Sequence, residues 1–150
     1  MTLTTDDTPL TDSAARLRLA IVRTSRRLRQ EAAGAVGELT PTSAAALVTV
    51  ERRGPLTPSE LAEIERVKRP TATRTLRVLS EAGLVERAPD PEDGRSALVS
   101  ITATGRERLR RMRRRKNAYL ARRMRDLSAG DVEALERAAE ILEGILEEPS

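Results

Sequence analysis

Apolar residues recur along most of the chain at the three- and four-residue spacing of amphipathic helices, as Leu17, Ala20, Ile21 and Leu28 illustrate. Two short stretches instead alternate apolar and polar residues, which is the pattern of β-strands. The chain is therefore expected to be mostly α-helical, with six helices and one small β-hairpin. The helices are predicted over about 12–33, 41–53, 58–65, 68–83, 103–126 and 129–147, and the strands over 84–88 and 97–101.

Capping signals predict where the helices in the middle of the chain begin and end. Thr57 is followed by Pro58 and Glu60, which predicts a capping box with proline in the first turn, where its missing N–H does no harm. A second helix is predicted to start at Lys68, with a proline two residues later. This helix is expected to end at Gly83. Two short helices joined by a tight turn form a helix-turn-helix.

The hairpin that follows turns this motif into a winged helix. Residues 89–96 between the two strands are rich in turn formers and form its tip. The second short helix has the width of the DNA major groove, and its first turn can reach base edges and phosphates. The residues expected to contact DNA are Lys68, Arg69, Pro70, Thr71, Thr73, Arg74 and Arg77 on this helix, and Arg95 and Ser96 at the tip.

Two of these arginines admit different roles. Arg74 lies one turn into the helix and is the better candidate for reading a base. Arg77 is expected to meet phosphate or to pair with Glu81 four residues later. Arg95 is placed to enter an adjacent minor groove.

The charge distribution supports a polyanionic partner. Residues 66–125 carry 18 Lys and Arg against 6 Asp and Glu, whereas the whole chain has a net charge of only +4. Codon bias accounts for the preference for Arg over Lys, but it does not account for the concentration of positive charge in the middle of the chain. The sequence therefore predicts binding to double-stranded DNA.

Composition excludes several other functions. The chain has no His and no Cys, which removes disulfides, imidazole bases and the usual zinc ligands. It also lacks a nucleophile elbow and a phosphate-binding loop, so no catalytic activity, cofactor or metal is expected. Residues 1–11 are polar and predict a flexible arm rather than a signal peptide, and no apolar run is long enough to span a membrane. A cytoplasmic location is expected.

Residues 56–105 resemble the MarR family of bacterial regulators. Asp93, Arg95 and Thr102 match the family's wing pattern, with Ile101 in place of leucine. The segment VKRPTATRTLRVLSEAGLVER is similar to the family's recognition helix and its exit. The order of the remaining helices is similar as well, so the likeness covers about 12–147.

The resemblance implies a dimer built from the N- and C-terminal helices, with one winged helix in each protomer. It also implies repression at short pseudo-palindromic operators, and in many members release from DNA by a small phenolic or lipophilic ligand. Asp93 would support the wing by orienting Arg95 through a salt bridge. Tyr119 is the only aromatic residue available to stack on such a ligand.

A single domain is predicted over 12–150, with the winged-helix lobe at about 41–102 and dimerisation helices at about 12–33 and 103–147. The apolar stripe of the last helix forms either a dimer seam or part of the internal core, and the dimer is the stronger hypothesis. The residues expected at the dimer interface are Leu17, Ile21, Leu135, Leu142, Ile145 and Leu146.

Alternative interpretations remain open for several features. The basic run 106–125 forms either a second polyanion surface or, as the favoured interpretation, a solvated helix that pairs with acidic groups of the terminal helices. The carboxylates of 90–93 fit wing-loop solvation better than a metal site. An architectural DNA-binding protein with little sequence preference, or a winged helix that binds an acidic protein, would share the same basic face.

Overall fold

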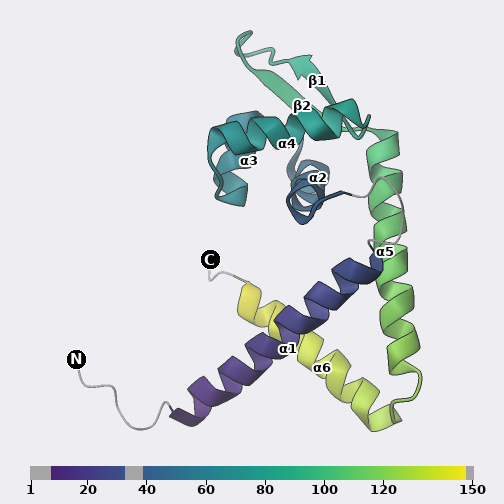
Figure 1. Cartoon of the computed structure of the whole chain (residues 1–150). Coiled ribbons are helices and arrows are strands. Elements are labelled where there is room, and N and C mark those ends of the chain that lie inside the picture. The colour runs from purple at the N-terminus through teal and green to yellow at the C-terminus, as the bar shows by residue number, and fades with distance from the viewer. Residues whose placement is uncertain (1–7, 33–38, 148–150) are drawn as a thin grey trace, which may run out of the picture. The chain divides into compact units, whose positions relative to one another are not determined.

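The computed structural model describes residues 8–32 and 39–147 (Figure 1). This part of the chain contains six helices and a two-stranded antiparallel sheet, which confirms the predicted fold class. The helices are α1 (Thr8–Ala32), α2 (Pro41–Arg53), α3 (Pro58–Glu65), α4 (Arg69–Glu81), α5 (Ala103–Met124) and α6 (Ala129–Leu146), and the strands are β1 (Val85–Pro89) and β2 (Ala97–Ile101).

The predicted element boundaries are accurate where a cap defines them. Helix α2 has the predicted bounds, and Ser128 caps α6 by accepting a hydrogen bond from the Asp131 N–H at 3.1 Å. The prediction was wrong at the N-terminus, because α1 already begins at Thr8 and residues 8–11 are helical rather than part of an arm. The other residues of the predicted arm lie outside the described part of the chain.

The chain divides into two compact units after Lys116. The first contains α1, the winged helix and most of α5. The second contains the end of α5 and all of α6. Each unit is described separately below.

The core of the first unit lies beneath the winged helix and is entirely aliphatic. Leu47 of α2, Leu61 of α3, Leu76 and Leu79 of α4, Val99 of β2 and Leu109 of α5 are all buried to 2% exposure or less. Each buried leucine contributes about 1.5–3 kcal/mol of hydrophobic stabilisation, so the helices do not need aromatic side chains to pack tightly. On α4 the apolar residues divide between two faces, because Leu76 and Leu79 are fully buried whereas Val78 is 48% exposed.

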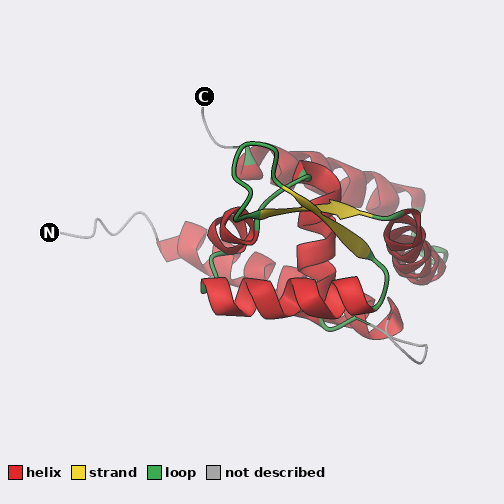
Figure 2. Ribbon diagram, turned by 90° about the horizontal axis from the view of Figure 1, so that it is seen from above, coloured by secondary structure: helices red, strands yellow, loops and turns green. Residues whose placement is uncertain are grey.

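The wing is joined to the helical core along both edges of β2. Val85 of β1 pairs with Ile101, and the register runs out to Pro89 opposite Ala97. On the other edge, Leu56 exchanges two backbone hydrogen bonds with Val99, at 2.8 and 3.1 Å. The connection between α2 and α3 therefore pairs with β2 through a single bridge at Leu56. Figure 2 shows the two strands of the hairpin from above.

The second unit consists mainly of α6, none of whose residues is buried within the single chain. Its apolar side chains are left partly or largely in solvent: Leu135 is 48%, Ile145 67% and Leu146 81% exposed. Among the described helices, none combines the length and apolar character that crossing a membrane would require.

Candidate nucleic-acid interface

The helix-turn-helix begins with the predicted capping box. The Thr57 N–H donates to Glu60 Oε2 at 2.8 Å, and the Glu60 N–H donates to Thr57 Oγ1 at 3.2 Å. Two otherwise unpaired backbone donors are satisfied reciprocally, which fixes the first residue of α3. The start of α3 is therefore determined by a segment of only four residues.

The turn between α3 and α4 depends on Arg66, which has left-handed backbone dihedrals (φ 54°, ψ 43°). The chain reverses here through two hydrogen bonds, from the Arg66 N–H to Glu63 O and from the Val67 N–H to Ala62 O. Such dihedrals are uncommon outside glycine, asparagine and aspartate. No sequence signal marked Arg66 as the turn residue.

Helix α4 presents a basic stripe opposite its buried face. Ala72, Leu76 and Leu79 point into the core, whereas Lys68, Arg69, Pro70, Arg74 and Arg77 are exposed. Pro70, Thr73, Arg74 and Arg77 follow one another at helical spacing, so they lie on one side of the helix. No acidic residue lies in the first turn of α4. The exposed side can thus face a polyanion without repulsion from its own first turn.

The two predicted threonines differ in position. Both are half-buried. Thr73 lies beside the exposed stripe, but Thr71 lies toward the flank, where its carbonyl accepts the hydroxyl of Thr75 at 2.9 Å. The two threonines therefore lie on opposite sides of the buried Ala72.

The wing tip exposes Arg95 on a loop held by its own backbone. The Asp90 N–H donates to Ser96 O and the Ser96 N–H donates to Asp93 O, both at 3.0 Å. Arg95 is exposed and Ser96 is half-buried. The loop is therefore a closed turn that presents the Arg95 side chain to solvent.

Asp93 supports the wing differently from the way the resemblance implied. Its Oδ1 accepts the backbone N–H of Arg95 at 3.1 Å. Within the described residues, the ion pairs do not include one between the Asp93 carboxylate and the Arg95 guanidinium. The carboxylate closes a local turn at its own position, as aspartate commonly does, and leaves the guanidinium available for another anion.

The recognition helix and the wing are linked by Thr102. Its hydroxyl donates to Gly83 O at 2.6 Å and accepts the Gly105 N–H at 3.0 Å, while its own N–H donates to Leu84 O at 3.0 Å. Gly83 has φ +73°, as expected for the glycine that ends α4. One side chain thus fixes the exit of α4, the base of the wing and the start of α5.

Comparison with known proteins identifies this arrangement. The MarR family model matches residues 39–97, which span α2 to the start of β2. An HTH-type transcriptional regulator of Mycobacterium bovis is 37% identical over 135 residues, which cover 90% of this chain and 93% of that protein.

The chain belongs to the MarR family.

Solved structures extend the likeness of this MarR-family chain to its whole length. A Pseudomonas aeruginosa protein described as a transcriptional regulator superimposes with a TM-score of 0.82 at 30% identity, covering 98% of this chain and all of that one. A mutant of S. aureus MepR bound to an oligodeoxyribonucleotide has the same fold, with a TM-score of 0.67 at 17% identity over 90% of this chain and 98% of that one. Family membership makes the chain a DNA-binding transcriptional regulator and not an enzyme.

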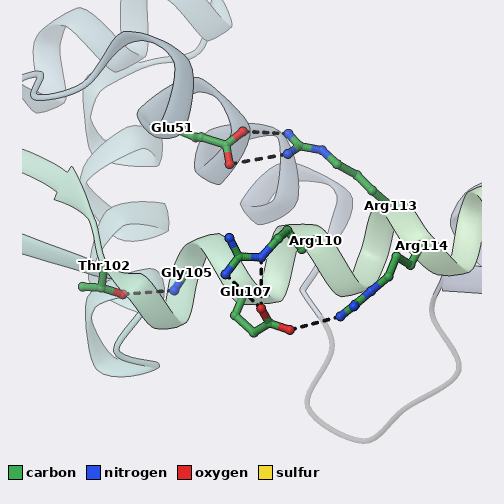
Figure 3. Close-up of polar contacts among 7 residues, drawn as sticks. All are labelled: Glu51, Thr102, Gly105, Glu107, Arg110, Arg113 and Arg114. Atoms are coloured by element: carbon green, nitrogen blue, oxygen red, sulfur yellow. Dashed lines mark hydrogen bonds and ion pairs between the residues drawn. The ribbon is translucent and has the colours of Figure 1, made fainter.

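The basic segment of α5 in this MarR-family chain is partly neutralised (Figure 3). Arg110 and Arg114 pair with Glu107 of the same helix at 2.9 and 3.1 Å, and Arg113 pairs with Glu51 of α2 at 2.7 Å. The hydrogen bond from Arg110, aided by the charges of Arg110 and Arg114, lowers the pKa of Glu107. The acidic partners of these three arginines come from α2 and α5, and Arg115 donates to Ala32 O at the end of α1 at 3.2 Å.

Two contacts that connect the elements of this MarR fold were not foreseen. The hydroxyl of Thr49 on α2 donates to the carboxylate of Glu65, 16 positions away at the end of α3. The Arg113–Glu51 pair joins residues 62 positions apart. A local pattern cannot reveal either contact, because the partners meet only after the chain has folded. In the part of the chain that the structure describes, no cluster of three or more potential metal ligands occurs.

Proposed function

We propose that the chain is a repressor that binds a pseudo-palindromic operator in double-stranded DNA as a homodimer, and that a small ligand releases it. The observation that carries the proposal is the exposed basic stripe of α4, directly opposite the buried Ala72, Leu76 and Leu79. Such a helix can enter the major groove without exposing its apolar side. A regulator of this kind would act in the cytoplasm, where its operator is located.

The proposed homodimer is supported by the apolar side chains that α1 and α6 leave in solvent. On α1, Leu17 is 44% and Ile21 43% exposed, and on α6, Ile141 is 54% and Ile145 67% exposed. A second copy of the chain would cover both sets of side chains. This agrees with the dimerisation helices predicted at about 12–33 and 103–147. Leu142 is only half-buried and fits the same interface.

Selection of bound duplexes from a random-sequence DNA library at physiological salt tests the function. We expect enrichment of an inverted repeat whose half-sites lie about one helical turn apart, because two recognition helices of a symmetric dimer would occupy successive major grooves. If the bound DNA remains random and elutes with modest salt, the architectural alternative replaces the repressor.

Loss of the wing arginine should weaken operator binding. Arg95→Ala is expected to reduce the binding free energy by about 1–3 kcal/mol, the scale of one good groove contact. Fluorescence anisotropy with the selected operator at fixed salt measures the change. Arg137→Ala, which removes an exposed arginine of α6, is the control and should leave the affinity nearly unchanged. Equal affinities for the wild type and the Arg95 variant would remove Arg95 from the interface.

Substitutions of Arg74 and Lys68 should distinguish a residue that reads a base from one that binds phosphate. Arg74→Ala is expected to cost about 1–3 kcal/mol and to relax the preference at one base position of each half-site. Lys68→Ala should weaken binding uniformly across sequences and make the slope of log K against log salt shallower by about one per protomer. Repeating the library selection and the salt titration with both variants checks these roles, and an unchanged sequence preference for the Arg74 variant would contradict base reading.

A further inference from the structure

Helix α1 carries an apolar stripe with positive charge on both sides of it. Leu10, Leu17 and Ile21 recur at the spacing of one helix face, and all three are exposed in the single chain. Arg16 and Arg18 precede and follow Leu17, so one of them lies on each side of the stripe. The whole helix has six arginines against two carboxylates. A surface that covers this stripe must therefore meet cations at both edges.

Helix α6 has the same layout with the opposite charge. Leu135 and Leu142 belong to its apolar stripe, and Glu136 and Glu143 follow them immediately, so they lie beside the stripe. Both glutamates are exposed. The helix has five carboxylates against one arginine. A surface that covers this stripe must therefore accommodate carboxylates at its edge.

These charges are not neutralised within the single chain. Among the described residues, Arg27 pairs with Glu31 on α1, but none of the ion pairs involves Arg16, Arg18 or Arg23. In the same part of the chain, no carboxylate of α6 forms an ion pair. Like charges that are neighbours on one helix repel each other by about as much as an opposite pair gains. Each helix would therefore be stabilised by a surface of the opposite charge.

The two charge patterns also match in spacing. Arg16 and Arg23 are seven residues apart, and so are Glu136 and Glu143. Seven residues make about two turns, or about 10.5 Å, on either helix. Helices aligned along their apolar stripes therefore bring arginine and glutamate together at two levels. Charges beside a hydrophobic seam select partners in this way in coiled coils.

We propose that α6 of one protomer packs against α1 of the partner subunit, and that the charges beside the two apolar stripes enforce this arrangement. Packing α1 against a second α1 would bring arginines together, and packing α6 against a second α6 would bring glutamates together, so both alternatives are disfavoured. A two-fold axis repeats the α1–α6 contact twice in each dimer. The inference rests on the proposed homodimer and adds what decides which helices pair.

Charge reversal on either helix tests the assignment. The α1 variant carries Arg16→Glu, Arg18→Glu and Arg23→Glu, and the α6 variant carries Glu136→Lys, Glu140→Lys and Glu143→Lys. Each variant alone should raise the dimer dissociation constant at least about tenfold, because like charges then face each other at both copies of the contact. Sedimentation equilibrium of the full-length protein without DNA measures the constant, and far-UV circular dichroism verifies that each variant is folded. Unchanged dissociation constants would overturn the proposal.

Mixing the two variants decides between a contact within one chain and a contact between two chains. In a mixed dimer, the new glutamates of one α1 face the new lysines of the partner's α6, and wild-type charges face each other at the second contact. We expect native mass spectrometry to show mainly the mixed dimer, with a dissociation constant within about threefold of the wild type. If mixing restores no dimer but all six substitutions in one chain do, α1 and α6 pair within a chain and the proposal is wrong.

A control variant makes the same change of charge away from α1 and α6. Arg52→Glu, Arg87→Glu and Arg106→Glu replace exposed arginines of α2, β1 and α5, and this variant should stay within about threefold of the wild-type dissociation constant. Dissociation equal to that of the α1 variant would show that net charge, and not helix pairing, controls assembly. If the wild type itself is monomeric, the proposed homodimer fails. If the wild type and both charge variants are dimeric, the homodimer stands and only the helix pairing is refuted.

Discussion

Replacing Leu135 and Ile145 by glutamate is expected to convert the protein to a monomer and to weaken operator binding at least about a hundredfold. The two side chains are 48% and 67% exposed on α6, so the glutamates remain hydrated in the single chain, whereas a dimer interface would bury them. A dimer on an inverted repeat binds its second half-site intramolecularly, and this effective concentration contributes about 10²- to 10⁴-fold in affinity.

Sedimentation equilibrium and anisotropy with the selected operator measure the two effects. Arg137→Glu is the control, because it changes the net charge by the same amount on an exposed residue of the same helix without placing a charge at an apolar position. Only the double variant should dissociate. A double variant that remains dimeric with unchanged affinity would place the dimer interface elsewhere.

Gly105→Ala is expected to destabilise the protein by about 1–3 kcal/mol or more, although alanine is the better helix former. A Cβ at this position would lie 2.2 Å from Leu84 O and 2.7 Å from the Ile101 side chain. Leu84 belongs to the backbone that joins α4 to the wing, so the clash cannot be relieved by rotating a side chain. The cost of displacing this backbone exceeds the roughly 1 kcal/mol that alanine gains in helix propensity.

Replacing Gly144 by alanine is expected to stabilise the protein instead. A Cβ there meets nothing within 4 Å, so Gly144→Ala should stabilise α6 by about 0.5–1 kcal/mol. Urea unfolding followed by circular dichroism measures both variants. Because Gly105 packs where the wing meets α4, its variant should also bind the operator more weakly. Equal stabilisation by both substitutions would show that α5 does not approach the wing as closely as described.

The parts of the interface that could be predicted are those whose determinants are close together in the sequence. The capping box of Thr57 and Glu60, the end of α4 at Gly83 and the cap at Ser128 all rest on contacts within about four residues. The basic stripe of α4 also follows from local periodicity, since residues three and four positions apart lie on the same face of a helix. These local features predicted the helix-turn-helix and the residues that we propose face DNA.

Predictions about partners of charged side chains were less successful. In place of the implied Asp93–Arg95 ion pair, the Arg95 backbone N–H donates a hydrogen bond to the Asp93 carboxylate at 3.1 Å. The acidic partners of Arg110, Arg113 and Arg114 are Glu107 and Glu51, and neither was singled out in the sequence. A long charged side chain can reach many groups, and the choice among them depends on geometry that a sequence pattern does not contain.

The sequence by itself therefore determined the succession of elements, the winged helix-turn-helix and the side of α4 that is charged, because short-range backbone sterics, capping bonds and hydrophobic periodicity specify them. Only the tertiary structure decided that Arg66 makes the left-handed turn, that Thr102 joins α4 to the wing, and that Arg113 of α5 holds Glu51 of α2. The Thr102 and Arg113 contacts require segments far apart in the chain to meet, and the packing of the aliphatic core brings them together. The Arg66 turn is local, but arginine is not a residue type that favours left-handed dihedrals, so the sequence did not indicate it.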